Sequence, residues 1–393
     1  MTCRCLNCIL PPHMLEHLAG SDRPELRAAA MRTLLATSEL RGERSVRATF
    51  LGVTAPTDGR RMIFDCGQRR DTRAARIART EQGTASADAS VNAAFDGLGQ
   101  TREFYRLVLG RNSIDGFGMR LDGYVHYDTA FNNAFWDGQQ MVFGDGDGIL
   151  FTDFTGSLDV IGHELTHGVT EHAAGLVYAN QPGALSESVS DVFGALVKQW
   201  AGKQEAASAD WLIGADIFTP EVEADALRSM RAPGTAYDSP TLGKDPQPDH
   251  MSRFVHKPEW DDNGGVHINS GIPNRAFYLV ATGIGGYAWE APGHIWYEAL
   301  KASSPTTDFQ AFAETTVLKA GQLYGASEQQ AVRAAWHDVG IEVGAAAVPR
   351  GRVAHGARPG SEAETLEELQ RQIRDLTKLV QGLAKASRRK EKA

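Results

Sequence analysis

The pentapeptide His163-Glu164-Leu165-Thr166-His167 is the feature that most constrains how this chain folds. Apolar residues flank it on both sides, as is typical of a buried helix: Leu158, Val160, Ile161 and Val169. Residues four apart share one face of a helix, so the two imidazoles can converge on one metal ion. Neutral imidazole suits Zn²⁺, and Glu164 can stand beside an attacking water without binding the metal. The pattern therefore predicts a zinc site on a buried helix.

A catalytic zinc needs a third protein ligand, and an acidic pair further along the chain can supply it. Glu187 and Asp191 are again four residues apart, on a segment that continues as an apolar helix. One carboxylate could bind zinc while the other accepts the N–H of a ligand imidazole. The plainer alternative is a solvated acidic face. Apolar neighbours argue against it, because they predict a buried helix: Leu185, Val189, Val192 and Phe193.

A further histidine follows a glycine-rich turn in the segment Asp262-Asn263-Gly264-Gly265-Val266-His267. An isolated histidine is usually structural. Here the acid five residues earlier could orient the ring and keep it cationic, and a cationic imidazole can stabilise an oxyanion. The turn is therefore a second candidate part of a catalytic site.

The order of the expected elements favours an α+β protein. Strand-like patterns occur at three places in the first part, residues 48–59, 63–65 and 122–127, and a helix is expected over residues 86–109. After residue 158 the chain becomes mostly helical. A strand-rich part followed by a helix-rich part favours two α+β lobes over an alternating doubly wound sheet.

Together with two further blocks, these residues make the chain resemble the thermolysin-type (M4) zinc metallopeptidases. The five blocks are residues 132–136 (Asn-Asn-Ala-Phe-Trp), the histidine helix, and residues 183–191, 225–230 and 263–271. They occur in order over about residues 48–343. The resemblance implies a two-lobed zincin, with the zinc helix between the lobes. The strand-rich N-terminal lobe would be residues 48–178, including the zinc helix, and the helical C-terminal lobe residues 179–343.

The resemblance also implies a role for each metal-site residue. His163, His167 and Glu187 would hold one catalytic zinc, with Asp191 behind His163. Glu164 would be the general base that takes a proton from the attacking water and passes it to the leaving amine. The chain would then be a neutral metalloendopeptidase.

The remaining implied roles concern the substrate. Tyr178 and His267 would donate hydrogen bonds to the tetrahedral oxyanion, with Asp262 orienting His267. The substrate backbone would be bound by three residues, Asn133, Ala134 and Arg228. An apolar pocket would receive the side chain after the scissile bond, which predicts cleavage before Leu, Ile, Phe or Val. Its expected lining is Phe151, Phe154, Val160, Ile213, Ile217 and Leu227.

The chain departs from the family at its paired calcium site. The positions that carry acidic groups in the family correspond here to Asp159, Lys198, Asp210 and Ala215. Two carboxylates are missing, and Lys198 would place a cation where the ions sit. We therefore expect this double site to be empty, while a second calcium site near residues 219–225 (Thr219 and Asp225) stays open.

The N-terminus is the other departure. About 45 residues precede the family match, with a Pro-Pro pair at Pro11-Pro12, which resembles the protealysin-like branch with its short propeptide. We interpret residues 1–47 as an inhibitory propeptide that the enzyme removes itself, with a helix over residues 25–40 and an exposed loop over residues 41–47.

Three of the four cysteines, Cys3, Cys5 and Cys8, crowd the start of this propeptide. A thiolate could reach the open position of the zinc, or the thiols could bind a separate metal with His13 or His17. The plainer alternative is a set of reduced surface thiols. So sparse a set of cysteines does not indicate a disulfide-stapled secreted fold.

Composition limits which binding partners and which cellular location are expected for this chain. A net charge of −9 and a pI near 5.8 argue against a nucleic-acid binder. No apolar run approaches the roughly 18 residues of a membrane span. A Sec signal peptide is not expected, because Pro11 interrupts the N-terminal stretch before an apolar region can form. We expect a cytoplasmic proenzyme, with secretion by a non-classical route as the alternative.

The C-terminal part is expected to stand apart from the catalytic body. Residues 344–361 have the composition of a linker. Residues 362–386 are expected to form an amphipathic heptad helix, with its seam at Leu366, Leu369, Ile373, Leu376, Val380 and Leu383. This seam favours a parallel homodimer, and a helix docked on its own body is the alternative.

Two rival functions remain at this point. A non-enzymatic relative could use the fold and the heptad helix for assembly, but Glu164, Tyr178 and His267 are all present. A different zinc hydrolase could share the histidine helix, but the spacing of Glu187 and the block around His267 disfavour it. A peptidase acting on peptide or protein substrates is the leading interpretation.

Overall fold

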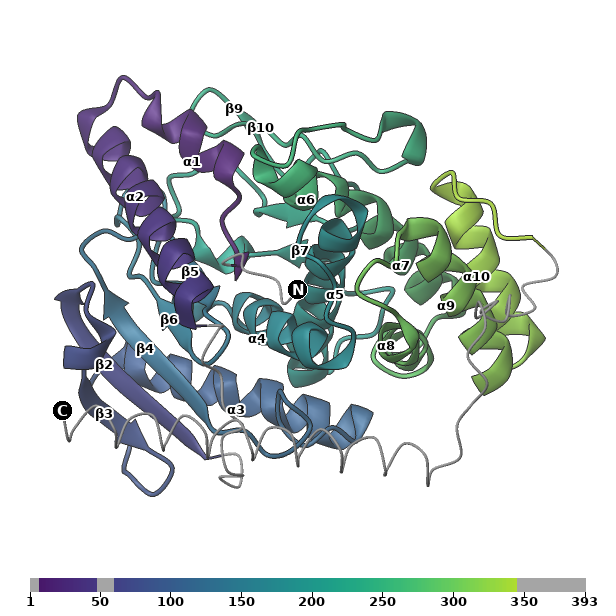
Figure 1. Ribbon diagram of the computed structural model, residues 1–393, viewed down its shortest axis with the longest axis horizontal. Helices are drawn as coiled ribbons and strands as arrows, with labels where there is room; N and C mark the ends of the chain where they lie inside the picture. Colours follow the sequence, from purple (N-terminus) through teal and green to yellow (C-terminus); the bar gives the residue numbers. More distant parts are fainter. Residues whose placement is uncertain (1–6, 48–59, 345–393) are drawn as a thin grey trace, which may run out of the picture. The chain divides into compact units, whose positions relative to one another are not determined.

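The computed structural model describes residues 7–47 and 60–344 (Figure 1). Its first part is built on six strands, namely β1 (Asn7–Cys8), β2 (Arg61–Arg69), β3 (Arg76–Thr80), β4 (Leu121–Tyr127), β5 (Ala134–Trp136) and β6 (Met141–Phe143). They form one mixed sheet in the order β1-β5-β6-β4-β2-β3. β4 runs parallel to both β2 and β6, and the other neighbours are antiparallel.

A long helix, α3 (Ala89–Leu109), packs against this sheet. Asp88 caps its start, because the carboxylate accepts hydrogen bonds from the backbone N–H groups of Ser90 and Val91. Gly110 ends the helix in the left-handed conformation, with φ 64°. The helix predicted over residues 86–109 is thus confirmed, starting three residues later.

The helix that carries the pentapeptide, α4 (Leu158–Ala173), lies between the sheet and the helical part of the molecule (Figure 1). It contacts α3 and β5, and it also contacts α5 (Asn180–Gly202). The helices that follow are α6 (Asp262–Asn269), α7 (Gly271–Ile284), α8 (Ala291–Ala302), α9 (Phe309–Leu323) and α10 (Ala326–Asp338). The expected α+β fold, with a strand-rich part followed by a helical part, is confirmed.

Short elements connect the larger ones. Two small antiparallel hairpins lie among the later helices: β7 (Leu212–Ile213) with β8 (Arg228–Ser229), and β9 (Asp238–Ser239) with β10 (Gly243–Lys244). Single 3₁₀ turns occur at η1 (Thr72–Ala74), η2 (Phe154–Gly156), η3 (Ala215–Ile217) and η4 (Met251–Arg253). The β7–β8 hairpin matters for the site, because it places Arg228.

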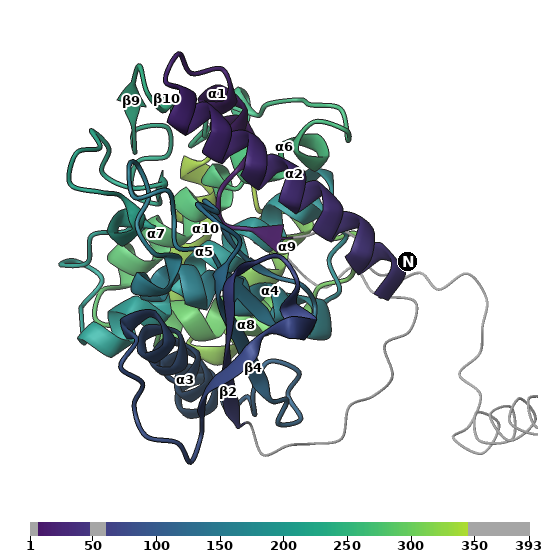
Figure 2. The ribbon, with the colours of Figure 1, turned by 90° about the vertical axis from the view of Figure 1, so that its left-hand side faces the viewer.

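The N-terminal segment, which we define as residues 7–47, contributes β1, α1 (Pro12–Ala19) and α2 (Pro24–Arg47). Figure 2 shows α1 and α2 on the side of the structure that faces the viewer. His17 Nε2 on α1 contacts the Pro240 carbonyl, next to β9, at 3.1 Å. Arg32 on α2 donates to the Thr129 carbonyl at 2.8 Å. The segment therefore contacts both the helical part and the strand-rich part.

Two of the local predictions were wrong. The expected loop over residues 41–47 is helical, because α2 continues to Arg47. Arg and Glu are good helix formers, and the single glycine there, Gly42, costs only about 1 kcal/mol in a helix. The strand expected to end at residue 65 continues to Arg69 as β2, and β3 was missed because arginines occupy much of its short length.

Several expectations concern residues outside the described ranges. They are the strand over residues 48–59, the linker over residues 344–361 beyond its first residue, the heptad helix over residues 362–386, and Cys3 and Cys5. Among the described residues, no helix has both the length and the apolar character needed to cross a bilayer.

Candidate active site

His163 and His167 project from one face of α4, as their spacing predicts. Their Nε2 atoms lie 3.0 Å apart, and both side chains are buried. Asp191 Oδ1 lies 2.8 Å from His163 Nδ1, and Ser186 Oγ lies 3.3 Å from His167 Nδ1. With these partners holding the Nδ1 protons, both Nε2 lone pairs are available to one ligand.

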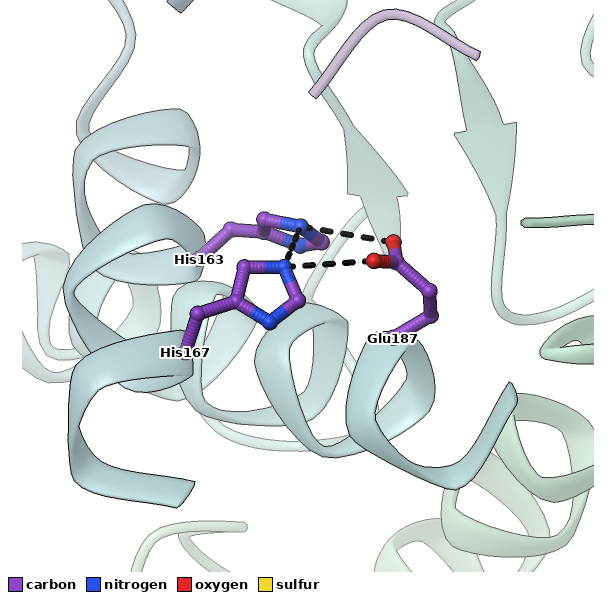
Figure 3. Close-up of side chains that lie close together, drawn as sticks. All are labelled: His163, His167 and Glu187. Carbon is purple, nitrogen blue, oxygen red and sulfur yellow. Dashed lines mark hydrogen bonds and ion pairs between the residues drawn. The ribbon is translucent and has the colours of Figure 1, made fainter. Parts of the chain in front are cut away.

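Glu187 comes to the same point from α5 (Figure 3). Its Oε2 lies 3.6 Å from His163 Nε2, and its Oε1 lies 3.3 Å from His167 Nε2. Within the part of the chain that the structure describes, these three side chains form a group of potential metal ligands whose ligating atoms all lie within 4.8 Å of one another. Glu187, the predicted third ligand, therefore lies beside both histidines.

The chemistry of this group fits a zinc ion. Two imidazole nitrogens and one carboxylate are a donor set of catalytic zinc sites. Glu187 Oε2 is buried and has no hydrogen-bond partner, which a bound cation would remedy. Burial lowers the pKa of His167 to about 4, although Glu187 opposes this, so the imidazole is in the neutral form that binds metals.

Asp191 connects His163 of the metal group to Arg228, one of the predicted backbone-binding residues. Besides His163, its carboxylate accepts two hydrogen bonds from Arg228, at 2.9 and 2.8 Å, and one from Asn274 Nδ2 at 2.8 Å. Burial raises the pKa of Asp191, but the Arg228 guanidinium and His163 outweigh it and lower the pKa to about 2. The carboxylate therefore stays ionised and holds both cationic and neutral partners in place.

Glu164 is buried beside the metal group without belonging to it. Its Oε2 accepts the backbone N–H of Trp136, the last residue of β5, at 3.0 Å. This bond fixes the carboxylate next to the strand that would carry a substrate. A carboxylate held near the metal site but outside its ligand set has the placement of a general base.

Tyr178 and His267 both lie close to Glu187 of the metal group. The Tyr178 hydroxyl donates to Glu187 Oε1 and lies 3.3 Å from His267 Nε2. Asp262 Oδ1 lies 2.5 Å from His267 Nδ1, and Asp262 Oδ2 accepts a hydrogen bond from the backbone N–H of His267. Burial lowers the pKa of His267, but Glu187 and Asp262 outweigh it and raise the pKa to about 9. The Asp262–His267 pair predicted from the sequence is thus in contact.

The backbone of the turn explains how Asp262 reaches the ring. Asp262, Asn263, Gly264 and Gly265 all have positive φ, from 49° to 84°. At Gly264 an added Cβ would lie 2.4 Å from Asn180 Oδ1, so the turn is tight as well as left-handed. This conformation needs the glycines that mark the segment in the sequence.

The N-terminal segment runs through this site as an added strand. β1 pairs antiparallel with β5, with Cys8 opposite Phe135. The Ile9 N–H donates to the Ala134 carbonyl at 3.2 Å, and the Leu10 N–H donates to Asn133 Oδ1 at 3.0 Å.

Two further contacts involve the backbone carbonyl groups of the N-terminal segment. Arg228 Nη1 donates to the Ile9 carbonyl at 3.0 Å, and His267 Nε2 lies 3.2 Å from the Cys8 carbonyl oxygen. The predicted backbone-binding residues therefore all contact the protein's own chain.

The six predicted pocket residues are all buried in one apolar cluster, which also contains Ile9 and Leu10. Their side chains are at most 1% exposed: Phe151, Phe154, Val160, Ile213, Ile217 and Leu227. The Leu227 N–H donates to the Ile213 carbonyl beside the β7–β8 hairpin. All six therefore belong to the same buried core as Ile9, the residue that follows Cys8.

At the expected calcium position, a lysine stands between two carboxylates. Lys198 Nζ lies 3.4 Å from Asp159 Oδ2 and 3.0 Å from Asp210 Oδ2. Burial lowers the pKa of Lys198, but the two carboxylates raise it above its usual value. A protonated amine therefore occupies the space between these acids.

Of the three cysteines in the expected propeptide, only Cys8 lies within the described residues. Its carbonyl oxygen contacts His267, while its sulfur is not part of the metal-ligand group among the described residues. His13 Nε2 instead contacts the Tyr237 hydroxyl, and His17 contacts Pro240. The hypothesis that a propeptide thiolate reaches the zinc therefore stays a prediction.

Sequence reasoning missed three supporting residues. Ser186 contacts His167, Asn274 donates to Asp191, and Gln247 Nε2 donates to the His267 carbonyl at 2.8 Å. A polar side chain inside the apolar stretch of α7 was the available signal for Asn274. Ser186 and Gln247 have no comparable signal, because their neighbours come from distant segments.

Comparisons with known proteins agree with this geometry. Residues 56–171 match the thermolysin metallopeptidase catalytic domain, and residues 174–341 match the thermolysin metallopeptidase alpha-helical domain. An extracellular metalloprotease of Pectobacterium carotovorum subsp. carotovorum is 44% identical over 345 residues, which are 87% of this chain and 99% of that protein. Protease PrtS of Photorhabdus sp. (strain Az29) is 48% identical over 269 residues, 68% of this chain and 72% of that protein.

A solved structure shows the same similarity in three dimensions. The precursor of protealysin, a metalloproteinase from Serratia proteamaculans, superposes with a TM-score of 0.78 at 46% identity. The match covers 85% of this chain and 99% of that one. With its metal-ligand group and both matched domains, the chain belongs to the M4 family of thermolysin-like zinc metalloendopeptidases.

Proposed function

We propose that this metallopeptidase is made as a proenzyme and cleaves peptide bonds on the N-terminal side of bulky apolar residues. One observation supports this most: the N-terminal segment lies on β5 as an added strand, with Ile9 held between Ala134 and Arg228. Adding a strand to an exposed sheet edge is a recurring way for proteins to bind extended peptides. The segment is thus bound as a substrate would be.

The residues around the site would divide the catalytic work. Held by His163, His167 and Glu187, zinc would polarise the substrate carbonyl and lower the pKa of water. Glu164 would accept a proton from the attacking water and deliver it to the leaving nitrogen. His267, oriented by Asp262, would donate a hydrogen bond where negative charge develops.

Tyr178 and the backbone-binding residues would complete the site. Tyr178 lies close enough to His267 to join it as an oxyanion donor. Asn133, Ala134 and Arg228 would fix the substrate backbone, which contributes through orientation. Every residue given a role here lies at the candidate active site.

The burial of Ile9 in the apolar core supports the proposed specificity. A side chain buried among Phe151, Val160 and Leu227 gains roughly 25 cal/mol per Å² of apolar surface removed from water, and a charged side chain there would be penalised. Cleavage of a peptide library should therefore favour Leu, Ile, Phe and Val after the scissile bond. A preference for charged residues at that position would contradict the proposal.

Casein digestion tests the proposed activity. The processed wild-type protein should degrade casein, and a zinc chelator should stop it. Glu164→Gln should lower kcat by about 10²–10⁴-fold, because the general base is lost, while zinc binding is kept. Zinc content measured on both proteins is the control. Absence of chelator-sensitive cleavage by the processed wild type would exclude the activity and favour the assembly role.

We also propose that the N-terminal segment inhibits the enzyme until the enzyme removes it. The contacts of Ile9 and Leu10 block the same groups that a substrate needs. The similarity to a protealysin precursor supports a proenzyme. The junction that is cut near residue 47 lies beside residues outside the described ranges.

Lys198 supports the proposal that the paired calcium site is not used. Its amine already pairs with Asp159 and Asp210, so a calcium ion there would meet a fixed positive charge. The melting temperature should therefore change by less than about 2 °C between excess calcium and a calcium chelator that spares zinc. Lys198→Glu should make the melting temperature rise with calcium. A large calcium effect on the wild type would contradict the proposal, unless it were traced to the second site near Asp225.

Location and assembly remain proposals. We propose synthesis as a cytoplasmic proenzyme, with export by a non-classical route as the alternative, and a relative named as extracellular favours the alternative. Fractionation of cells and medium distinguishes the two. Self-association through residues 362–386 can be tested by sedimentation of the full chain beside a Leu369→Asp variant.

A further inference from the structure

The contacts of Cys8, Ile9 and Leu10 define a register. Backbone groups of three successive residues contact four different parts of the site: β5, the Asn133 side chain, Arg228 and His267. A strand in an antiparallel ladder cannot slip by one residue without moving every side chain to the opposite face. Ile9 and Leu10 are both buried in the apolar cluster, so such a slip would be costly.

This register singles out one peptide bond. His267 is the candidate oxyanion donor, and the carbonyl oxygen it contacts is that of Cys8. The next nitrogen is the Ile9 N–H, which donates to Ala134. Glu164 is held by the N–H of Trp136, two residues further along the same strand. The bond between Cys8 and Ile9 thus lies between the oxyanion donor and the strand that positions the general base.

We propose that the Cys8–Ile9 peptide bond is a cleavage site of the protein's own active site, cut within the same molecule. Water adds its oxygen to the carbonyl carbon of Cys8, and the bond to the Ile9 nitrogen breaks. One water proton passes by way of Glu164 to that nitrogen. The products are a Cys8 carboxyl group and an Ile9 amino group.

The cut has a chemical consequence that can be read from the sequence. The part on the N-terminal side carries Cys3, Cys5 and Cys8, so one early cut separates three of the four cysteines from the catalytic body. The part from Ile9 onward keeps Pro11, α1 and α2, whose contacts with the body do not involve the cleaved bond. This cut is therefore distinct from removal of the whole propeptide near residue 47.

Mapping new amino termini tests the inference, which rests on the proposed function. Full-length protein is purified without zinc, zinc is added, and free α-amino groups are labelled over time and identified by mass spectrometry. A terminus at Ile9 should appear with a rate constant that stays the same over a tenfold dilution, because the cut is intramolecular. Glu164→Gln and a zinc chelator should each abolish it.

Two substitutions at one position provide matched controls. Ile9→Leu keeps an apolar side chain and should still give a terminus at position 9. Ile9→Asp should slow its appearance at least 100-fold. Zinc stoichiometry and casein digestion by each variant show whether the catalytic body has folded.

The outcomes separate this inference from the function it rests on. Casein digestion without a terminus at position 9 would overturn the inference and leave the peptidase intact. A cut at a neighbouring bond, or one whose rate constant rises with concentration, would also overturn it. Zinc-loaded protein that never digests casein would overturn both.

Discussion

Asp191 shows how one buried carboxylate can join two functions. It accepts hydrogen bonds from His163, Arg228 and Asn274, and its side chain is fully buried. Arg228 in turn holds the Ile9 carbonyl. The orientation of a zinc ligand and the binding of a peptide carbonyl therefore depend on the same side chain. Breaking one partner of a buried ion pair costs about 3–5 kcal/mol, so each member constrains the others.

His13 gives the docking of the N-terminal segment a pH dependence. Burial lowers its pKa from 6.5 to about 4, while Asp262 opposes this effect. The unfolded chain binds a proton below about pH 6.5, but the folded chain binds it only near pH 4. Stability from this site is therefore present above pH 6.5 and falls as the pH drops from about 6.5 toward 4.

Urea unfolding of the Glu164→Gln protein, which cannot process itself, measures this effect. Between pH 7.5 and pH 5, His13→Gln should lose about 2 kcal/mol less stability than its parent, since one proton contributes about 1.4 kcal/mol per pH unit below about pH 6.5. His17→Gln, at an exposed position of the same helix, is the control and should keep the full acid sensitivity. An equal acid loss in the His13→Gln protein and its parent would contradict the assignment.

For single residues, the sequence predicts best the contacts that depend on spacing along one helix. His163 with His167, and Glu187 with Asp191, are each four residues apart on a helix, so their faces follow from the helix period. The contact of Asn274 with Asp191 joins residues 83 positions apart. Such contacts arise from how helices pack, which no local pattern specifies.

Among the elements, α4 and α5 determine whether the ligands meet. They pack closely at two glycines, where a Cβ added to Gly162 would lie 3.0 Å from the Gly194 Cα. A Cβ on Gly194 would lie 2.5 Å from the Asp159 carbonyl oxygen and 3.1 Å from the His163 nitrogen. Backbone atoms cannot move aside cheaply, so the two helices would have to separate.

Gly194→Ala should therefore weaken both folding and zinc binding. We expect a loss of about 1–3 kcal/mol in stability from overpacking, and at least tenfold weaker zinc binding, because Glu187 moves away from the histidines. Gly283→Ala, on the exposed face of α7 with nothing near its added Cβ, should gain up to about 1 kcal/mol. Denaturant melts and competition with a zinc-binding dye measure both effects. Unchanged zinc affinity in Gly194→Ala would show that the close packing does not position the ligands.

Element boundaries were harder to predict than element types. The helix at residues 25–40 was expected, but its continuation to Arg47 was not, because arginine-rich stretches are equally common in exposed loops and helices. β1 has only two residues and exists because β5 offers it an edge. A strand that depends on a partner more than 120 residues away has no signal of its own.

On the scale of the whole molecule, the N-terminal segment adds the edge strand beside β5, where we propose that substrate binds. β1 occupies the edge of the sheet beside β5, and the apolar side chains of Ile9 and Leu10 fill part of the core. When the segment leaves, β5 becomes an open edge next to the metal group, which is where an extended substrate can add. In the proposed mechanism, latency and substrate binding would thus both use this one edge.

A time course on one sample measures whether this edge belongs to a working zinc peptidase. Zinc is added to the full-length protein, and casein hydrolysis and loss of the N-terminal segment are followed together by fluorescence and mass spectrometry. Hydrolysis should start near zero and rise in step with loss of the segment, and Glu164→Gln should show neither change. Full hydrolysis while the segment is intact, or none after its loss, would contradict this mechanism.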